Sequence, residues 1–415
     1  MSDYDATRLD PLSVDYVALA FGIERHLPGY VDAYLGPPPA REAALAAPPP
    51  EPERLVDAAR TLAMRIAEAD IPDTRVGYLT AQVEAMLTTC RQLAGDIIPY
   101  PEEVHRLFDI DAERTPEATL DDAMASLDDL VPGTGPLRER MIAWRHGLEV
   151  SPESARVIID AVMPELRART SELVDLPDGE SVEIRFVDDK PWRGYNWYLG
   201  GARSRVEVNT DLPIHAHTLV DLICHEAYPG HHTEHALKER LYREEGYGEH
   251  AIQLINTPEC VISEGIATSA AAAIFAGDEL ARFEEERIYP MTGIDPGIAP
   301  RTIKQIARAE AQLQAARANA ALLLHADGRS EDEVVAYLQQ YRLRSEPEAR
   351  QDLRFLADPL WRAYTFTYHV GRALLGRWLD GAPTVPERVA RFHTLLTDQV
   401  YPSQIRSWIA RDGGS

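Results

Sequence analysis

The sequence is organised around the stretch Cys224-His225-Glu226-Ala227-Tyr228-Pro229-Gly230-His231-His232-Thr233-Glu234-His235. Six histidines and glutamates fall within the eleven residues from His225 to His235. Imidazole nitrogens and carboxylate oxygens are ligands that zinc accepts in proteins. We therefore expect this stretch to carry the chemistry, and we interpret the rest of the chain as its support.

The stretch begins like a zinc-binding helix and then departs from that pattern. A helix with the pattern His-Glu-x-x-His presents two imidazoles one turn apart, with the glutamate beside a metal-bound water. His225 and Glu226 fit the start, but Pro229 stands where the second histidine belongs. Proline lacks an amide hydrogen and crowds the carbonyl of His225, and Gly230 adds backbone freedom. The helix is therefore expected to bend or open here.

A second histidine ligand is expected after this bend. In a regular helix His231 would lie about 240° around and about 9 Å along the axis from His225, too far for one shared ion. Distortion of the helix brings the two rings together. His232 stays open as an alternative second ligand. A surface pair of His231 and His235, spaced four apart, is a rival interpretation that leaves Glu226 without a role.

The same run resembles the HExxPGHH signature of a large bacterial family of unassigned function, whose fold is related to the carboxypeptidase Taq zinc peptidases, a branch of the gluzincins. In that family the histidine directly after Pro-Gly recurs while its neighbour varies, so the resemblance favours His231 over His232. Gluzincins take their third ligand from a glutamate on a later helix. The segment Ser263-Glu264-Gly265-Ile266-Ala267-Thr268 resembles the EGWA-type segment of the family and nominates Glu264, with Ile266 replacing the usual tryptophan.

The resemblance implies a zinc-dependent hydrolase of peptide bonds that is similar to a carboxypeptidase. His225, His231 and Glu264 hold Zn²⁺ in this interpretation, which leaves the fourth position to water, as in catalytic zinc sites. Glu226 activates that water as general base and later returns the proton to the leaving amine. The segment from Tyr368 to Arg372 resembles the YxxG segment of the family, and it nominates Tyr368 as hydrogen-bond donor to the oxyanion.

Several residues and two further functions stay open at this point. Arg372 and His232 are the expected substrate-binding residues. His369 and His325 are weaker candidates for a substrate carboxylate, with a plain surface role as the alternative. The first further function is a zinc amidase that acts on a small non-peptide substrate with the same residues. The second is a binding protein that kept the scaffold without catalysis.

Composition excludes some classes of partner. The chain has 415 residues, and its 67 acidic against 42 basic side chains give a net charge of −25. Such a charge argues against nucleic acid and anionic membranes as partners. It either attracts cationic substrates or only keeps the surface solvated. A peptide or a small amide is the expected substrate, and the sequence leaves the oligomeric state open.

The cellular location is expected to be the cytoplasm. The chain has three cysteines: Cys90, Cys224 and Cys260. A small and odd number of cysteines does not suit a disulfide framework, which indicates a reducing compartment. The first eight residues lack the basic and apolar regions of an export signal. No apolar run approaches the 18 residues of a membrane span.

The fold is expected to be mainly α, a large helical zincin-like body with a small β-sheet next to the zinc-binding helix. Two segments, 182–186 and 205–209, alternate apolar and polar residues as half-buried strands do. A capped helix begins at Ser151, and Pro164 is expected to kink it. We expect an N-terminal helical subdomain over 1–150 and a gluzincin-like catalytic domain over 151–415. Apolar residues at helical spacing predict further helices, among them 55–69, 82–93, 267–276, 300–324, 355–379 and 386–396.

Overall fold

The computed structural model describes residues 9–190 and 192–413, and helices dominate it. Helices hold 65 % of the residues and strands hold 7 %. The mainly α fold expected from the sequence is therefore confirmed. Residues 1–8, on which the expected lack of an export signal depends, lie outside the described residues.

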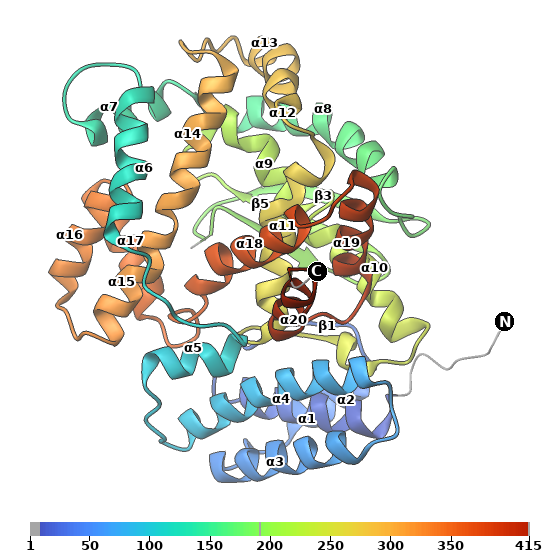
Figure 1. Ribbon diagram of the computed structural model, residues 1–415. Helices are drawn as coiled ribbons and strands as arrows, with labels where there is room; N and C mark the ends of the chain where they lie inside the picture. The colour runs from blue at the N-terminus through green and yellow to red at the C-terminus, as the bar shows by residue number, and fades with distance from the viewer. Residues whose placement is uncertain (1–8, 191, 414–415) are drawn as a thin grey trace.

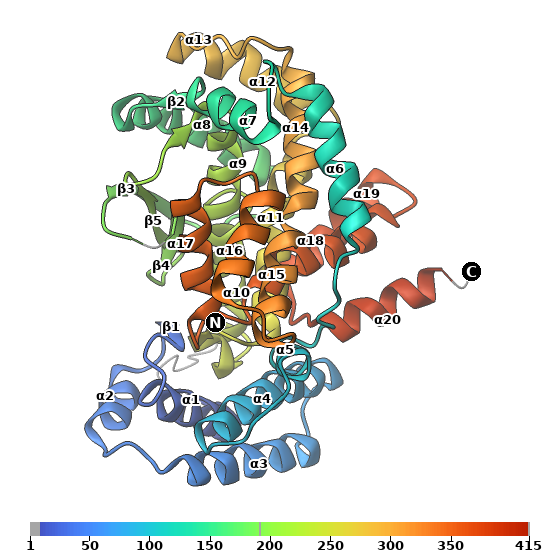
Figure 2. The same cartoon turned by 90° about the vertical axis from the view of Figure 1, so that its left-hand side faces the viewer.

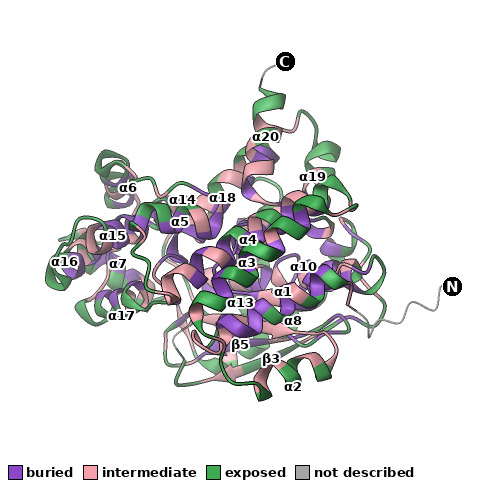
Figure 3. Ribbon diagram, turned by 90° about the horizontal axis from the view of Figure 1, so that it is seen from below, coloured by how far each residue is buried: buried purple, intermediate pink, exposed green. Residues whose placement is uncertain are grey.

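The N-terminal helices form a layer along one side of the molecule, at the bottom of Figure 1. Buried residues of the third helix recur at helical spacing, while its other side is exposed, as Figure 3 shows. This amphipathic pattern explains why the helix lies flat on its neighbours. The layer consists of α1 (Pro11–Glu24), α2 (Pro38–Ala46), α3 (Pro52–Glu68), α4 (Asp73–Leu93) and α5 (Tyr100–Phe108).

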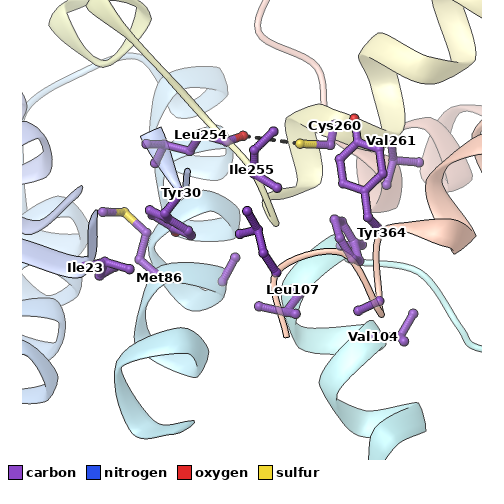
Figure 4. Close-up of a cluster of buried hydrophobic side chains, with 14 of the residues drawn as sticks. Ile23, Tyr30, Met86, Val104, Leu107, Leu254, Ile255, Cys260, Val261 and Tyr364 are labelled. Atoms are coloured by element: carbon purple, nitrogen blue, oxygen red, sulfur yellow. Dashed lines mark hydrogen bonds between the residues drawn. The ribbon is translucent and has the colours of Figure 1, made fainter. Parts of the chain in front are cut away.

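One hydrophobic core joins this layer to later parts of the chain. The strand β1 (Val31–Tyr34) pairs antiparallel with β7 (Ile252–Leu254). Figure 4 shows the junction, where side chains of the layer meet those of later segments: Ile23, Tyr30, Met86, Leu107, Leu254, Val261 and Tyr364. Core packing therefore crosses residue 150, where the sequence suggested a boundary.

The other helices stand above this layer, around the segment that carries the predicted site. Two predicted helices differ from the structure: 300–324 is divided at Gln314, and 355–379 is interrupted between Ala357 and Thr365. The helix that follows Ser151 contains Pro164 and continues past it. The bounds are α6 (Glu117–Leu130), α7 (Leu137–His146), α8 (Pro152–Ser171), α12 (Glu279–Phe283), α13 (Tyr289–Thr292), α14 (Pro300–Leu313), α15 (Ala315–His325), α16 (Glu331–Tyr341), α17 (Glu346–Ala357), α19 (Val385–Thr397) and α20 (Pro402–Asp412), with the short turns η1 (Gly248–Ala251) and η2 (Glu284–Ile288).

A three-stranded sheet lies beside the predicted site, and one of its strands was not predicted. The predicted strands are confirmed as β3 (Ser181–Val187) and β5 (Arg203–Asn209), but these two pair in parallel. The antiparallel partner of β5 is β4 (Gly194–Tyr198), a strand that was not predicted. The strand order β3-β5-β4 leaves β4 at an edge of the sheet. A separate two-stranded pair joins β2 (Glu149–Val150) to β6 (Ile214–His215).

Two helices that carry predicted site residues pack backbone against backbone. They are α11 (Pro258–Ile274) and α18 (Thr365–Asp380). A β-carbon on Gly371 would lie 2.5 Å from the carbonyl oxygen of Val261, and one on Gly265 would lie 2.6 Å from Leu375 Cδ2. Only glycine permits this approach, which places Glu264 of α11 beside the tyrosines at the start of α18.

Among the described residues, no single helix is long and apolar enough to cross a membrane. One bent pair meets the length and composition test, α11 together with the segment Glu279–Thr292, with a bend of 71° between them. Most residues of α11 are buried in the protein core.

We predict that Gly371→Ala destabilises the protein by about 2–3 kcal/mol, because the added methyl group overlaps backbone that cannot move independently. Gly376→Ala is the matched control on the same helix, since a β-carbon there meets nothing within 4 Å. This control is expected to be neutral or to stabilise by roughly 0.5–1 kcal/mol, as alanine does in a helix interior. Urea unfolding of both variants checks the prediction, and equal midpoints would contradict it.

Candidate metal centre

The predicted break in the motif helix is present and sharp. The helix α9 (Ala216–Glu226) ends at Glu226, and α10 (His231–Arg243) begins after four intervening residues. In the break, the amide of Gly230 donates to the carbonyl of Cys224 at 3.0 Å. A β-carbon at Gly230 would lie only 1.9 Å from the carbonyl oxygen of His225. Glycine is therefore required where the chain folds back on the end of α9.

This break brings the two predicted histidine ligands together. The ring centroids of His225 and His231 lie 4.8 Å apart. One ligand atom each from His225, Glu226 and His231 lies within 4.8 Å of the others, so these three residues could hold a metal ion. The bend thus brings together two histidines that a straight helix would hold too far apart to share one ion.

Glu264 supplies a second carboxylate at the same place. Its Oε2 atom lies 3.6 Å from Nε2 of His225. Within the described part of the chain this buried oxygen has no hydrogen-bond partner, while Oε1 accepts from the Tyr364 hydroxyl at 3.0 Å. An unpartnered buried carboxylate oxygen is costly, and a cation beside His225 would satisfy it. The close group consists of two imidazoles and Glu226, with a Glu264 oxygen beside His225, and such donors fit a divalent ion such as zinc.

Burial sets the protonation of these groups. It raises the pKa of Glu226 to about 8, and the nearby charge of Glu264 adds to the rise. It also raises the pKa of Glu264 to about 8, against the effect of the Tyr364 hydrogen bond. Burial lowers the pKa of His225 to about 4 and that of His231 well below its usual value. Neutral imidazole is the form that binds metal, and a bound cation favours the ionised carboxylates.

A chain of hydrogen bonds orients His231. The Ser263 hydroxyl donates to Glu234 Oε2 at 2.6 Å, and Lys238 donates to the other oxygen of Glu234 at 2.7 Å. The single hydroxyl proton of Ser263 is thereby used, so its oxygen accepts from Nδ1 of His231 at 3.0 Å. This arrangement places the imidazole proton on Nδ1 and leaves the Nε2 lone pair free for a ligand. Ser263 and Glu234 were not predicted as site residues.

Three tyrosines surround the carboxylates, and sequence reasoning named one of them. Tyr364 holds Glu264 directly, and its ring lies edge-on to that of Tyr368 with centroids 5.6 Å apart. Burial raises the pKa of Tyr368, and the charges of Glu264 and Glu226 raise it further, which places its hydroxyl in their field. The Tyr195 hydroxyl, on β4, donates to Asp32 of β1. A spacing of four between Tyr364 and Tyr368 is the signal that would have indicated the missed residue.

His232 does not lie with the metal-binding group. It is fully buried, with Nδ1 2.9 Å from the Ser204 hydroxyl and Nε2 3.0 Å from Glu180 Oε2. Burial by itself would raise the pKa of Glu180, but hydrogen bonds from His232, Tyr228 and Arg167 lower it to about 2. Both ring nitrogens of His232 are therefore occupied by protein partners. This finding corrects the prediction that His232 binds substrate, and it also excludes His232 as an alternative metal ligand.

The remaining candidates are dispersed. Arg372 lies exposed on α18. His325 binds the carbonyl of Leu356 through Nε2 at 2.7 Å, which is a structural contact. His369 is partly buried against the ring of Phe366. His235 stacks on His231 at 5.9 Å between centroids, while its Nδ1 lies 2.8 Å from Gln253 Nε2.

Comparison with known proteins shows a shared fold. No protein-family model matches the chain, and no curated protein sequence matches it. The crystal structure of a putative lipoprotein from Colwellia psychrerythraea is similar, with a TM-score of 0.53, 15 % identity, and coverage of 98 % of this chain and 78 % of that one. A putative lipoprotein of unknown function from Shewanella oneidensis gives a TM-score of 0.47 at 13 % identity, covering 99 % of this chain and 84 % of that chain.

We predict that His231→Ala loses bound zinc, whereas His232→Ala retains about one ion per chain, since only the first ring faces His225. His232→Ala is expected to unfold at lower temperature instead, because Ser204 and Glu180 lose a buried partner. Elemental analysis of both purified proteins, with thermal unfolding, decides the assignment. A zinc-free His232→Ala protein that is still folded would show that the ligand choice is wrong.

We predict that Ser263→Ala weakens zinc binding by about tenfold, because His231 loses the acceptor that fixes its tautomer. Ser204→Ala is a matched control, since Ser204 makes the equivalent contact to Nδ1 of His232 at 2.9 Å. Competition with a chelator of known affinity measures both variants. Similar losses in the two variants would mean that the Ser263 effect is a general loss of stability.

Proposed function

We propose that the protein is a zinc-dependent hydrolase that cleaves amide bonds of peptides. The observation that carries this proposal is the close group of His225, Glu226 and His231, with the unpartnered oxygen of Glu264 buried 3.6 Å from Nε2 of His225. The His225 side chain keeps 23 % of its surface exposed, so solvent reaches this side of the group. His225, His231 and Glu264 would hold the metal.

Glu226 is the proposed general base. When bound, zinc supplies a Lewis acid that acidifies water and polarises a carbonyl group. Glu226 follows a proposed ligand directly in sequence, and its buried carboxyl group would take a proton from the attacking water and give it to the leaving nitrogen. Asn196 donates to the backbone carbonyl of Glu226 at 2.7 Å and fixes this end of α9 to the sheet.

The tyrosines divide two tasks in this proposal. Tyr364 uses its hydroxyl proton on Glu264, so it orients the carboxylate. Tyr368 remains for the substrate, and its hydroxyl would donate to the oxygen that gains charge as the carbonyl is attacked. Because the pKa of Tyr368 is raised by burial, the phenol keeps its proton for this role.

The sheet edge offers a way to align a peptide. β4 is the terminal strand of its sheet and passes directly against Glu226, since a β-carbon on Gly194 would lie 3.0 Å from Glu226 Oε1. An extended substrate can bind such an edge through its backbone. This feature favours a peptide over the small non-peptide amide that a zinc amidase would use. Cleavage of acyl-amide metabolites without any cleavage of peptides would favour the amidase.

The proposed location is the cytoplasm. All three cysteines are buried free thiols, which suits a reducing compartment. The description of the Colwellia protein as a putative lipoprotein suggests the cell envelope as the alternative. Fractionation of cells that produce the full-length chain distinguishes the two.

We predict that Glu226→Gln keeps its zinc but lowers turnover by a factor of about 10²–10⁴, the usual contribution of a general base. A peptide-library digest, run with and without chelator on the wild type and the variant, measures activity, and elemental analysis measures zinc. Loss of the metal in Glu226→Gln would instead make Glu226 a ligand. A wild-type protein that binds zinc but cleaves neither peptides nor amides would support the non-catalytic alternative.

A further inference from the structure

Asp32 on β1 is a carboxylate that lies close to the proposed metal centre without being part of it. It accepts a hydrogen bond from the Tyr195 hydroxyl of β4, and Figure 2 shows β1 below the sheet, at the top of the N-terminal layer. The register of β1 on β7 shifts between Val31 and Ala33, so Asp32 lies at a β-bulge. A bulge redirects a side chain, and here the side chain of Asp32 reaches a different sheet.

Asp32 has no cation to balance its charge among the residues that the structure describes. Its Oδ1 atom accepts from Tyr195, and its Oδ2 atom makes neither a hydrogen bond nor an ion pair with any described residue. Burial raises the pKa of Asp32, opposed only by the hydrogen bond from Tyr195. Both residues nevertheless keep part of their surface exposed, so solvent reaches the pair. A partly desolvated carboxylate without a counter-ion is unfavourable, and a bound cation would relieve this cost.

A second tyrosine–carboxylate contact on the same strand shows what Asp32 lacks. Tyr198 of β4 donates to Glu239 of α10. Glu239 also pairs with Arg243 at 2.9 Å and accepts from the amide of Gly201 at 2.8 Å. The protein therefore supplies its own cation at Glu239, whereas the described residues supply none at Asp32.

Through β4, the pair adjoins Glu226 of the proposed metal centre. Both neighbours of Tyr195 in the strand touch this residue. Asn196 donates to the carbonyl of Glu226 at 2.7 Å, and a β-carbon on Gly194 would lie 3.0 Å from Glu226 Oε1. Burial raises the pKa of Tyr195, and the charges of Asp32 and Glu226 raise it further, so the hydroxyl keeps its proton and lies within the field of both carboxylates.

Through β1, the pair adjoins the histidines of the centre. Ala33, next to Asp32, pairs with Gln253 of β7. The side-chain amide of Gln253 lies 2.8 Å from Nδ1 of His235, and the ring of His235 stacks on that of His231 at 5.9 Å between centroids. A substrate at the metal centre can therefore extend to Asp32 over a short distance.

We propose that Asp32 and Tyr195 form a subsite for an ammonium group of the substrate, an inference that rests on the proposed hydrolase function for its catalytic meaning. An ammonium group carries three donors, and Asp32 Oδ2 and the Tyr195 hydroxyl oxygen can accept from two of them. The hydroxyl oxygen is available because its own proton is donated to Asp32. The rings of Trp192 and Trp197 pack against the Tyr195 ring, at 4.9 Å and 4.8 Å between centroids, and hold it in place.

The subsite narrows the expected substrates to amides that carry a positive charge. The ammonium group comes either from the N-terminus of a peptide or from a basic side chain such as that of lysine. The net charge of −25 draws cations toward the protein as a whole, whereas Asp32 binds the ammonium group at one place.

Binding of three tripeptide amides tests the subsite. The probes are Ala-Ala-Ala amide with a free N-terminal ammonium group, its neutral acetylated form, and acetyl-Ala-Lys-Ala amide. Calorimetry uses the full-length Glu226→Gln protein, to prevent turnover, both zinc-loaded and stripped of metal, at about pH 7 and about 0.15 M salt. We expect at least one ammonium probe to bind about tenfold more tightly than the neutral probe in both states. The preferred ammonium probe identifies the source of the group.

Variants in the same background locate the preference. Asp32→Asn keeps an acceptor for Tyr195 but removes the charge, and it is expected to lose about tenfold in affinity for the preferred ammonium probe. Tyr195→Phe removes the hydroxyl acceptor and is expected to lose about fivefold. Neither change is expected to alter affinity for the neutral probe. Glu239→Gln is the matched control, because it makes the same change of charge at the other tyrosine contact of β4, and we expect it to keep the preference.

The outcomes separate this inference from the hydrolase proposal. Equal affinity for the ammonium and neutral probes overturns the subsite, and so does a preference that needs zinc, because the amine would then bind the metal. A preference that survives in Asp32→Asn also overturns it, and if that variant does not fold, an unchanged preference in Tyr195→Phe does so instead. An equal loss in Glu239→Gln overturns it as well, since overall charge would then be the cause. A protein that takes up no zinc contradicts the hydrolase proposal, while the metal-free measurement still decides the subsite.

Discussion

The lack of space for any side chain at Gly230 is the constraint on which the site depends. The backbone of this residue lies against the carbonyl oxygen of His225. The helix is therefore interrupted for four residues, and a new helix begins at His231. The imidazoles that a straight helix would separate then face one another. Pro229 contributes by ending the hydrogen-bond pattern of α9, so the break is built into the local sequence.

Distant elements complete what the break begins. Glu264 arrives on α11, and its position depends on the glycine contact between α11 and α18 that also places Tyr364 against it. Behind His231, the buried chain from Ser263 through Glu234 to Lys238 fixes the ring. The site is thus a meeting point of several rigid helices, which suits a group of ligands that must keep their geometry.

The sequence predicted those parts of the site that are encoded locally. The bend follows from the chemistry of proline and glycine, and the mainly α fold follows from helical spacing of apolar residues. Ser263 and Glu234 escaped prediction because their contacts with each other and with His231 join different helices, which no spacing in the chain encodes. Tyr364 was missed although its spacing of four from Tyr368 indicates a shared helix face. β4 was not predicted, and alternation of apolar and polar residues does not show which strands pair, so the parallel pairing of β3 and β5 was not predicted either. His232 was misassigned because His231, its neighbour in sequence, has the same side chain. In the structure the two rings have different partners: His231 contacts Ser263, whereas His232 contacts Ser204 and Glu180.

The most direct measurement is a crystal structure of the zinc-loaded protein with anomalous scattering at the zinc edge. We predict one ion, bound by imidazole nitrogens of His225 and His231 at about 2.0–2.1 Å and by a Glu264 oxygen at about 2.0–2.2 Å. Glu226 would lie beside the ion without binding it. An ion held by Glu226 while Glu264 stays apart, or no ion at this position, would contradict the account.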